Sequence, residues 1–404
     1  MKRFFLFFVL FSCALFSCVK SEFAGDPNAE NATKWTVEQR ESIDSIRPVE
    51  GSDGHIFEMN YTADYKLDEC IKAVDGDLQN SISNIYSVLL PDSKVLISKP
   101  STQGVNCSCF SSASSDGEYV LGRNYDYPSG SNYYVVLHTN PKNGYKSVAM
   151  ADVSVLLEKT SSENPFSTVR NKEAALFFPT ATFDGINEKG LMCSFMQLEF
   201  EETHQNTGKQ KLVSSWILRL LLDKCATVDE AIELIKNYDF QSVFSGYDQD
   251  LHYMIADASG KRVVVEHVAD ELKVLNSQDI FGKDVPYIVS TNFYLTPGRR
   301  VAPKEGIARK ELGFWRWNKL QEDLIKNPTP SKDEAMKYMQ DVRIVFNDQD
   351  EIADIQKKGN DPTDINSWTW MTLWSSVYNT KDLGLDVCIR ENYDKKFSFG
   401  IDAK

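Results

Sequence analysis

The sequence NCSCF at residues 106–110, followed by VLGRNYDY at residues 120–127, decides how this chain folds. Both runs read as strands, and the small polar residues between them predict that they pair as an antiparallel hairpin. Such pairing brings a thiol of the first run close to Arg123 and Asp126 of the second. A guanidinium favours the thiolate form of a nearby cysteine, and a carboxylate can hold a neighbouring amine or water. The hairpin is therefore the first candidate for a reactive site.

Strand-like and helical runs around this hairpin predict the fold class. Further strands are expected at residues 133–138, 147–155, 174–183, 191–200, 252–257, 262–267, 287–291, 373–378 and 385–390. Helices are expected within residues 67–85 and at residues 214–224, 227–237, 314–326 and 333–342. This order of elements predicts an α+β body in which two sheets pack together with helices outside, an αββα arrangement.

Composition narrows the class of protein further. The 404 residues are 42% hydrophobic, which is ample for a packed core and excludes wholesale disorder. The net charge of −14 argues against nucleic acid or an anionic membrane as the main partner, because both select clustered Lys and Arg. No apolar run reaches the roughly 20 residues that a membrane-spanning helix needs.

The first eighteen residues read as a targeting signal. Lys2 and Arg3 precede an apolar run at residues 4–16, which is short for a membrane span and typical of a signal-peptide core. The overlapping LFSC at residues 15–18 resembles a bacterial lipobox, in which Cys18 is acylated and becomes the mature N-terminus. An ordinary secretory signal is the alternative. We expect an exported lipoprotein, periplasmic or on the outer membrane or cell surface, held to a membrane by lipid on Cys18.

Two segments of different character lie between this signal and the hairpin. Residues 19–54 are polar and rich in Gly, Pro, Asn, Ser and Glu, and they are expected to form a flexible tether. In residues 55–106, apolar side chains recur at helical spacing from Leu67 to Ile85, which predicts a mostly helical segment.

Cysteine and histidine usage gives no sign of a metal site. Six cysteines would remain after export: Cys70, Cys107, Cys109, Cys193, Cys225 and Cys388. They are too few for a disulfide scaffold in a chain of this size, and the sequence has no CxxC pair or HExxH motif. Single bridges stay open, including one from Cys107 to Cys70 or Cys109. Of the five histidines, His267 lies in an apolar strand and is expected to be packed.

Spacing separates the two cysteines of the hairpin. Arg123 and Asp126 follow Cys107 by 16 and 19 residues, and they follow Cys109 by 14 and 17. With the first spacing, the chain resembles the N-terminal-nucleophile (Ntn) hydrolases of the choloylglycine hydrolase, acid ceramidase and penicillin V acylase family, which cleave linear amide C–N bonds. Three later motifs match that family in order: DGINEKGL at residues 184–191, STNF at residues 290–293 and TLWSSVY at residues 372–378.

The resemblance implies a fold and a way of activating the thiol. Residues 107–404 would form the four-layer αββα Ntn-hydrolase sandwich of two antiparallel sheets. Cys107 would be the nucleophile and its own α-amino group the base, since a model amino group has a pKa of about 7.7–8.0. Because Cys107 is internal, this requires cleavage between Asn106 and Cys107. Residues 55–106 would then be a pro-segment or remain bound as part of a light chain of about 10 kDa.

The resemblance also implies roles for other residues. Arg123 and Asp126 would position the thiol and the amine, and the Asn292 side chain would stabilise the oxyanion. Gln197 stands where relatives have Asn or Tyr, so its backbone N–H would be the second donor. Arg316 is expected to orient the site, with Arg299 and Arg300 as rivals. No metal or organic cofactor is implied.

The expected substrate is a small N-acyl amide with an apolar acyl chain, such as an N-acylethanolamine, a ceramide-like lipid or a conjugated bile acid. Acyl transfer to an amine would use the same acyl-enzyme. A different class of function also stays open: a surface lipoprotein that binds glycans or peptides without catalysis, with Cys107 buried or bridged. The aromatic stretch at residues 368–374 would then be either core or a carbohydrate-stacking surface, and core is the expectation.

Overall fold

The computed structural model describes residues 35–91, 106–128, 133–154, 156–158, 160, 162, 164–199, 201–244, 249–299, 313–344 and 370–403. Residues Thr36–Lys404 form one compact unit. The targeting signal with Cys18, and Arg300, lie outside the described residues.

The larger of the two main sheets has nine strands in the order β1-β2-β5-β6-β7-β8-β11-β12-β13. Their bounds are β1 Arg47–Pro48, β2 Ile56–Tyr61, β5 Tyr134–Thr139, β6 Ser147–Asp152, β7 Thr182–Asn187, β8 Met192–Glu199, β11 Gln249–Ala256, β12 Arg262–Val268 and β13 Glu271–Leu275. Neighbours pair antiparallel except β2 and β5, which run parallel.

The second sheet has six strands, all antiparallel, in the order β14-β3-β4-β15-β16-β17. Their bounds are β3 Asn106–Ala113, β4 Tyr119–Pro128, β14 Tyr287–Ser290, β15 Trp370–Asn379, β16 Gly384–Ile389 and β17 Asn392–Phe399. The predicted β3–β4 hairpin lies in this sheet. A small parallel pair, β9 Gln210–Val213 and β10 Tyr238–Gln241, stands apart from both sheets.

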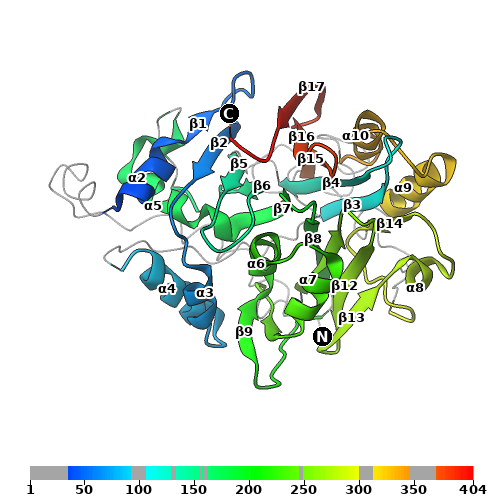
Figure 1. Ribbon diagram of the computed structural model, residues 1–404, viewed down its shortest axis with the longest axis horizontal. Helices are drawn as coiled ribbons and strands as arrows, with labels where there is room; N and C mark the ends of the chain where they lie inside the picture. The colour runs from blue at the N-terminus through cyan, green and yellow to red at the C-terminus, as the bar shows by residue number, and fades with distance from the viewer. Residues whose placement is uncertain are drawn as a thin grey trace, which may run out of the picture. The chain divides into compact units, whose positions relative to one another are not determined.

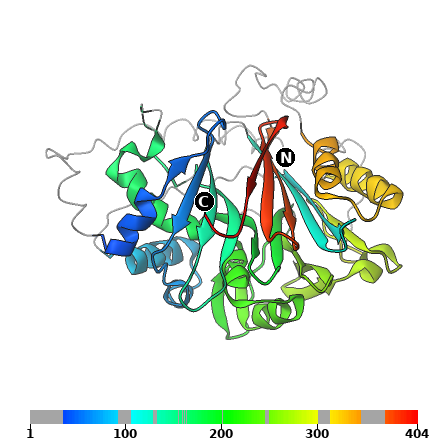
Figure 2. The same cartoon turned by 45° about the horizontal axis from the view of Figure 1, so that its top comes forward.

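Helices cover the outer face of each sheet, as Figures 1 and 2 show. On the nine-stranded sheet these include α6 Ile217–Lys224, followed in the chain by α7 Val228–Ile235. On the six-stranded sheet they are α9 Phe314–Lys326 and α10 Lys332–Asp341. The remaining α-helices are α2 Val37–Asp44, α3 Leu67–Lys72, α4 Leu78–Leu89, α5 Val169–Ala174 and α8 Ser277–Phe281, and short 3₁₀ helices are η1 Pro165–Ser167, η2 Ala175–Ala181 and η3 Ser214–Trp216.

The main hydrophobic core lies between the two sheets. Leu121, Tyr125 and Trp374 of the six-stranded sheet pack with Met150 and Met254 of the nine-stranded sheet, and all five are buried. A second core fills the space between the six-stranded sheet and α9 and α10. The order helix, sheet, sheet, helix confirms the predicted α+β class and its four layers. Trp374 is fully buried, so this residue of the aromatic stretch belongs to the core.

The DGINEKGL motif turns out to join the layers. A Cβ on Gly185 would lie 2.8 Å from Leu222 of α6, so only glycine allows this helix to pack so closely. Asn187 donates from Nδ2 to the carbonyls of Leu222 and Cys225 and so satisfies the C-terminal end of α6. Gly190 has φ +81°, which suits the tight turn between β7 and β8.

The strand predicted at residues 174–183 is wrong over most of its length. Residues 175–181 form η2, and β7 begins only at Thr182. The run from Ala175 to Pro179 is almost completely buried, and a short buried apolar run does not distinguish a strand from a helix by its pattern. Pro179 also weakens the case for an inner strand, because it lacks the N–H that a sheet needs.

The segment before the hairpin is more ordered than the sequence indicated. The predicted tether contains α2, which begins with a complete capping box at Thr36 and Gln39, and β1. The following segment does contain helices α3 and α4, but it also supplies β2 to the large sheet. Polar composition concealed α2 because its buried face is small and only Ser42 and Ile43 are buried. Within the described residues, none of the helices has the length and apolar character to span a membrane.

Candidate active site

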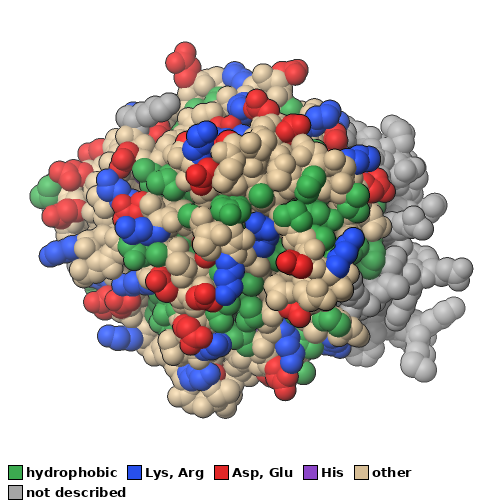
Figure 3. Space-filling model, turned by 45° about the vertical axis from the view of Figure 1, so that its right-hand side comes forward, with side chains coloured by type: hydrophobic (Ala, Val, Ile, Leu, Met, Phe, Trp, Pro, Cys, Tyr) green, Lys and Arg blue, Asp and Glu red, His purple; other side chains and the backbone are tan. Residues whose placement is uncertain are grey.

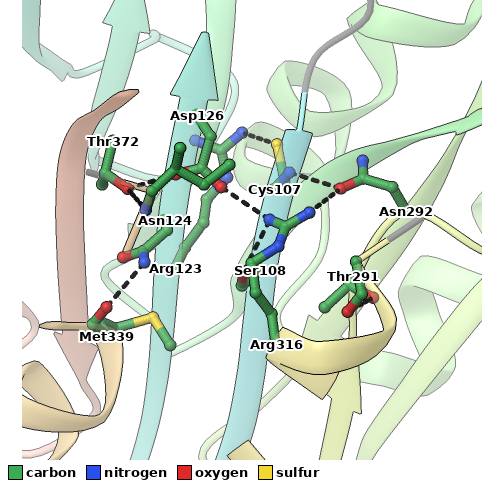
Figure 4. Close-up of polar contacts among 12 residues, drawn as sticks. Cys107, Ser108, Arg123, Asn124, Asp126, Thr291, Asn292, Arg316, Met339 and Thr372 are labelled. Carbon is green, nitrogen blue, oxygen red and sulfur yellow. Dashed lines mark hydrogen bonds and ion pairs between the residues drawn. The ribbon is translucent and has the colours of Figure 1, made fainter. Parts of the chain in front are cut away.

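Cys107 lies near the start of β3, with its side chain fully buried between the two sheets. In the β3–β4 register it faces Tyr125, while Cys109 faces Arg123 and Asn106 faces Asp126. Because side chains alternate along a strand, Cys107 and Arg123 project to the inner face, and Ser108 and Asp126 project toward α9. The site is therefore built on both faces of one hairpin (Figure 4).

Arg123 is the side chain that contacts the thiol directly. Its Nη2 lies 3.4 Å from Cys107 Sγ and also donates to the Phe195 carbonyl at 3.3 Å. The guanidinium carbon stands 5.1 Å from the Tyr125 ring and 5.5 Å from the Trp374 ring, so aromatic faces enclose the cation. The aromatic rings and the hydrogen bond to the Phe195 carbonyl hold the Arg123 guanidinium at one place beside the sulfur.

Asp184 neutralises Arg123 and was not predicted as a site residue. Its Oδ2 accepts from Arg123 Nη1 at 2.7 Å and from Trp374 Nε1 at 3.3 Å. Its Oδ1 accepts from Ser376 Oγ at 3.0 Å and from the Tyr378 hydroxyl. The Asp184–Arg123 pair has no exposed side-chain surface, and such a pair is stable only when its remaining lone pairs are satisfied. Arg123 comes from the VLGRNYDY run, and the other three donors all come from the TLWSSVY motif at residues 372–378.

Asp126 and Arg316 form a second buried ion pair on the other face of the hairpin. Arg316 Nη1 donates to Asp126 Oδ2 at 2.7 Å and to Ser108 Oγ at 3.0 Å. Thr372 donates to Asp126 Oδ1 at 2.5 Å. Arg316 stands in the first turn of α9, so packing of this helix on the sheet carries the guanidinium to the hairpin.

Asn292 links the two faces. Its Oδ1 accepts from the backbone N–H of Cys107 at 2.7 Å and from Arg316 Nη2 at 3.0 Å. Two donors on this atom identify it as the oxygen of the amide. Its Nδ2 donates to the Gln197 carbonyl at 2.9 Å. The structure thus brings the main-chain carbonyl of Gln197 to Asn292, and the expected role of the Gln197 N–H as an oxyanion donor stays a prediction.

The choice between the candidate arginines is clear from position. Arg316 is fully buried among Asp126, Ser108 and Asn292. Arg299 has 46% of its side chain exposed and pairs with Glu201. Of the two candidates that the structure describes, Arg299 and Arg316, only Arg316 contacts the site.

Burial raises the pKa of the Cys107 thiol to about 11, although Arg123 opposes the shift. Burial also raises the pKa of Asp126 to about 6, and here Arg316 opposes the shift. In the intact chain, the thiol is therefore protonated at neutral pH, and a base must take its proton before it can react. An amino group at Cys107 would lie directly beside it.

Neither a disulfide nor a metal cluster involves the described part of this site. Cys70, Cys107 and Cys109 are free thiols, so the bridges left open in the sequence are absent from this chain. Across the described residues, His, Cys, Asp and Glu side chains form no group of three that could hold a metal ion. His267 is buried against Phe240, and burial lowers its pKa to about 4, which confirms the expectation of a packed histidine.

Comparison with known proteins adds the family. Residues 107–296 match the family described as linear amide C–N hydrolases, choloylglycine hydrolase family. Over 178 residues the chain is 26% identical to the bile salt hydrolase/transferase of Clostridium perfringens (strain 13 / Type A), which covers 42% of this chain. That match spans 51%, about half, of the length of this curated relative.

Solved structures show weaker overall similarity. Two mutants of the conjugated bile acid hydrolase from Clostridium perfringens are 18% and 16% identical, with TM-scores of 0.43 and 0.45, and each match covers 73% of this chain and 92% of that one. Penicillin V acylase from Agrobacterium tumefaciens is 14% identical, with a TM-score of 0.40, over 73% of this chain and 86% of the other. The family match over residues 107–296 makes this part of the chain similar to the linear amide C–N hydrolases of the choloylglycine hydrolase family.

Proposed function

We propose that this protein hydrolyses the amide bond of N-acyl amides, with Cys107 as nucleophile after cleavage of the Asn106–Cys107 bond. One observation carries the proposal: Cys107 Sγ lies beside Arg123 while its backbone nitrogen lies 2.7 Å from Asn292 Oδ1, at the residue where the family match begins. Cleavage would turn that nitrogen into an amine, next to the thiol it must deprotonate.

The amine carries a proton in each half of the reaction. The Cys107 sulfur attacks the acyl carbonyl as the α-amine takes the thiol proton, and Asn292 Nδ2 and the Gln197 N–H stabilise the oxyanion. The C–N bond then breaks as the ammonium returns that proton to the leaving nitrogen. Water next attacks the thioester as the amine takes one of its protons. The C–S bond then breaks, the ammonium gives that proton to the sulfur, and the carboxylic acid and free thiol are released. An amine in place of water would complete an acyl transfer.

Cleavage uses the same thiol before the amine exists. The Cys107 thiol attacks the Asn106 carbonyl, the C–N bond breaks and the thiol proton passes to the leaving nitrogen, so that the acyl group lies on sulfur and the α-amine is free. Water then hydrolyses the thioester, which releases the thiol and leaves Asn106 with a carboxylic acid. Asp126 faces Asn106 in the strand register, so it stands across from the bond that breaks and near the amine that forms. We propose that the two pieces stay associated, because β2 and β5 pair over six residues.

The substrate class follows from the relatives and from the core. The curated relative is named a bile salt hydrolase/transferase, and residues 107–296 match a family of linear amide C–N hydrolases. Aromatic side chains line the inner face beside Cys107, including Tyr125 and Phe183, and they suit an apolar acyl chain. We propose an N-acylethanolamine, a ceramide-like lipid or a conjugated bile acid.

A matched pair of cysteine variants tests the function. Cys107→Ala should remain one uncut chain and lose hydrolysis of taurocholate, an N-acylethanolamine and penicillin V assayed side by side. Cys109→Ala, two residues along the same strand face and equally buried, should be cut and active. N-terminal sequencing of the heavy piece should read Cys-Ser-Cys-Phe. Full activity in an uncut chain would refute the mechanism, and saturable binding without turnover would favour a binding lipoprotein instead.

We also propose that the protein is an exported lipoprotein anchored through Cys18, on the strength of the LFSC sequence at residues 15–18.

A further inference from the structure

The segment that presents Asn292 is held by two polar side chains of the opposite sheet. Residues 291–296 follow β14 of the six-stranded sheet, and Asn292 is the second residue of this segment. His252 of β11 and Glu266 of β12 reach it from the nine-stranded sheet, and both side chains are completely buried. Neither residue belongs to a motif that the sequence analysis singled out.

His252 holds the residue next to Asn292. Its Nε2 lies 2.6 Å from the Thr291 carbonyl oxygen, and the Ser290 hydroxyl is 3.3 Å from the same nitrogen. On the other side of the ring, Nδ1 lies 3.1 Å from Glu266 Oε1. The imidazole therefore bridges the carboxylate of one sheet and the main chain of the other.

Glu266 holds the far end of the same segment. Its Oε1 accepts from the Leu295 N–H at 2.8 Å, and its Oε2 accepts from the Thr296 N–H at 3.0 Å and from Thr296 Oγ1 at 2.7 Å. With His252, this gives four hydrogen bonds on two oxygens, as many as a carboxylate accepts well. Burial alone would raise the pKa of Glu266, but His252 and the donors of the segment lower it overall.

The pair of His252 and Glu266 is completely buried. The Thr291 carbonyl can only accept a hydrogen bond, so His252 Nε2 is the donor between them. A buried polar pair of this kind contributes little net stability compared with apolar residues, so its contribution must be sought in what it positions.

We infer that His252 and Glu266 are positioning residues, a hydrogen-bonded brace that fixes residues 291–296 and thereby aims the Asn292 amide at the oxyanion. The inference rests on the proposed function, since it assigns Asn292 the oxyanion role. Removing an oxyanion donor altogether lowers the rate by about 10²–10³. Loss of the brace should displace the donor without removing it, so the expected loss of rate is smaller.

Kinetics of His252→Phe test the brace. This variant keeps a planar aromatic ring and loses both hydrogen bonds, and kcat should fall about 10–100-fold with KM within about twofold. His252→Gln can still donate to the Thr291 carbonyl and should recover part of the loss. His267→Phe changes a buried histidine of the neighbouring strand that contacts no site residue, and it should keep the wild-type kcat. A loss of equal size in both histidine positions would overturn the inference.

A double variant shows whether His252 acts through Asn292. In the Asn292→Ala background, His252→Phe should lower kcat no further, because there is no amide left to aim. Full additivity of the two losses would overturn the brace while leaving the proposed function intact. An Asn292→Ala protein with wild-type kcat would instead remove the oxyanion role from the proposed function.

NMR of the wild-type mature protein tests the hydrogen bond without any variant. The His252 Nε2–H should show a scalar coupling across its hydrogen bond to the Thr291 carbonyl, and the His267 ring, which packs against Phe240, should show no coupling to that carbonyl. A His252 ring without this coupling would contradict the brace even if His252→Phe failed to fold.

Discussion

At the scale of single residues, the site divides between the two faces of β4. Arg123 and Asp126 are three residues apart, an odd number, so their side chains point in opposite directions. Arg123 meets the thiol, and Asp126 meets Arg316 behind it. Arg123, 16 residues after Cys107, therefore contacts the Cys107 sulfur. Asp126, 19 residues after Cys107, pairs with Arg316, which also contacts Asn292, the partner of the Cys107 nitrogen.

Sequence reasoning found the residues that carry reactive groups and missed those that hold them. Cys107, Arg123 and Asn292 stand in short motifs, and the structure brings them together. Asp184 also stands in a motif, yet its partner Arg123 is 61 residues away and only the packed sheets reveal the pair. The role of Glu266 could not be found from the sequence, because it depends on contacts between β12 of one sheet and residues 295–296, which follow β14 of the other.

Replacement of Asp184 should be costly for both stability and activity. Asp184→Asn places an amide NH₂ among four donors and leaves the Arg123 charge buried without a counterion. The free energy of unfolding should fall by about 3–5 kcal/mol, and activity should fall at least about 10-fold as Arg123 loses its fixed direction. Urea unfolding and hydrolysis assays measure the two effects.

The matched control is an ion pair at the surface. Glu233 pairs with Lys236, and the two side chains are 73% and 50% exposed. Glu233→Gln should change the free energy of unfolding by less than about 1 kcal/mol. Equal losses in the two variants would show that the buried position of Asp184 has no special importance.

The raised pKa of Asp126 predicts how activity depends on pH. Ionised Asp126 is the form that pairs with Arg316, and its pKa is raised to about 6, so this form is lost as the pH falls through 6. The α-amine must also be unprotonated, with an ordinary pKa of about 7.7–8.0. The slope of log kcat/KM against pH should therefore be about one below pH 7.5 and about two below pH 6. In Asp126→Asn, the residual activity should keep a slope of one throughout.

At the scale of elements, periodicity predicted most of the strands and helices from Cys107 onward. The helix predicted at residues 314–326 coincides with α9, and the long apolar helix at residues 214–224 appears as η3 and α6. Short edge strands such as β1 and β13 escaped, because an exposed strand of few residues carries almost no hydrophobic pattern. The buried 3₁₀ run before β7 was mistaken for a strand for the opposite reason, since it is apolar throughout.

Strand β2 is the element that ties the upstream segment to the rest. It lies parallel to β5, and the Glu58 side chain of β2 lies 3.0 Å from His138 of β5. Beyond β2, the Tyr65 hydroxyl donates to Asp223 of α6 at 2.5 Å. These contacts are buried and polar, which makes them specific to this pairing.

Two adjacent residues of β2 allow a test of this association. Met59 is completely buried and Asn60 is exposed, because neighbours on a strand face opposite ways. Met59→Asp should release the light piece from the mature protein, while Asn60→Asp should leave the two pieces together. Size-exclusion chromatography followed by denaturing electrophoresis measures the association. Co-elution of both pieces in both variants would show that β2 does not hold them.

At the scale of the whole molecule, the described chain from Thr36 is one compact unit rather than a catalytic domain with a separate helical appendage. The face seen in Figure 3 mixes acidic and basic side chains, so the negative charge is not gathered there into one patch.

The proposed lipid anchor on Cys18 predicts the cell fraction in which the protein is found. Cys18→Ala should abolish labelling by an alkyne fatty acid and move the protein from the membrane fraction to the aqueous extract. Cys13→Ala changes a cysteine inside the apolar run of the signal and should leave both properties unchanged. Labelling that survives in Cys18→Ala would contradict the anchor.

The position of β2 ahead of Cys107 has a consequence for assembly. Before the proposed cut, β2 and β5 meet within one molecule, so recovery from denaturant should be first order and independent of protein concentration. After the cut, the same sheet can form only when two separate molecules collide. The mature enzyme should therefore regain activity poorly on dilution from urea, and its yield should rise when extra light piece is added.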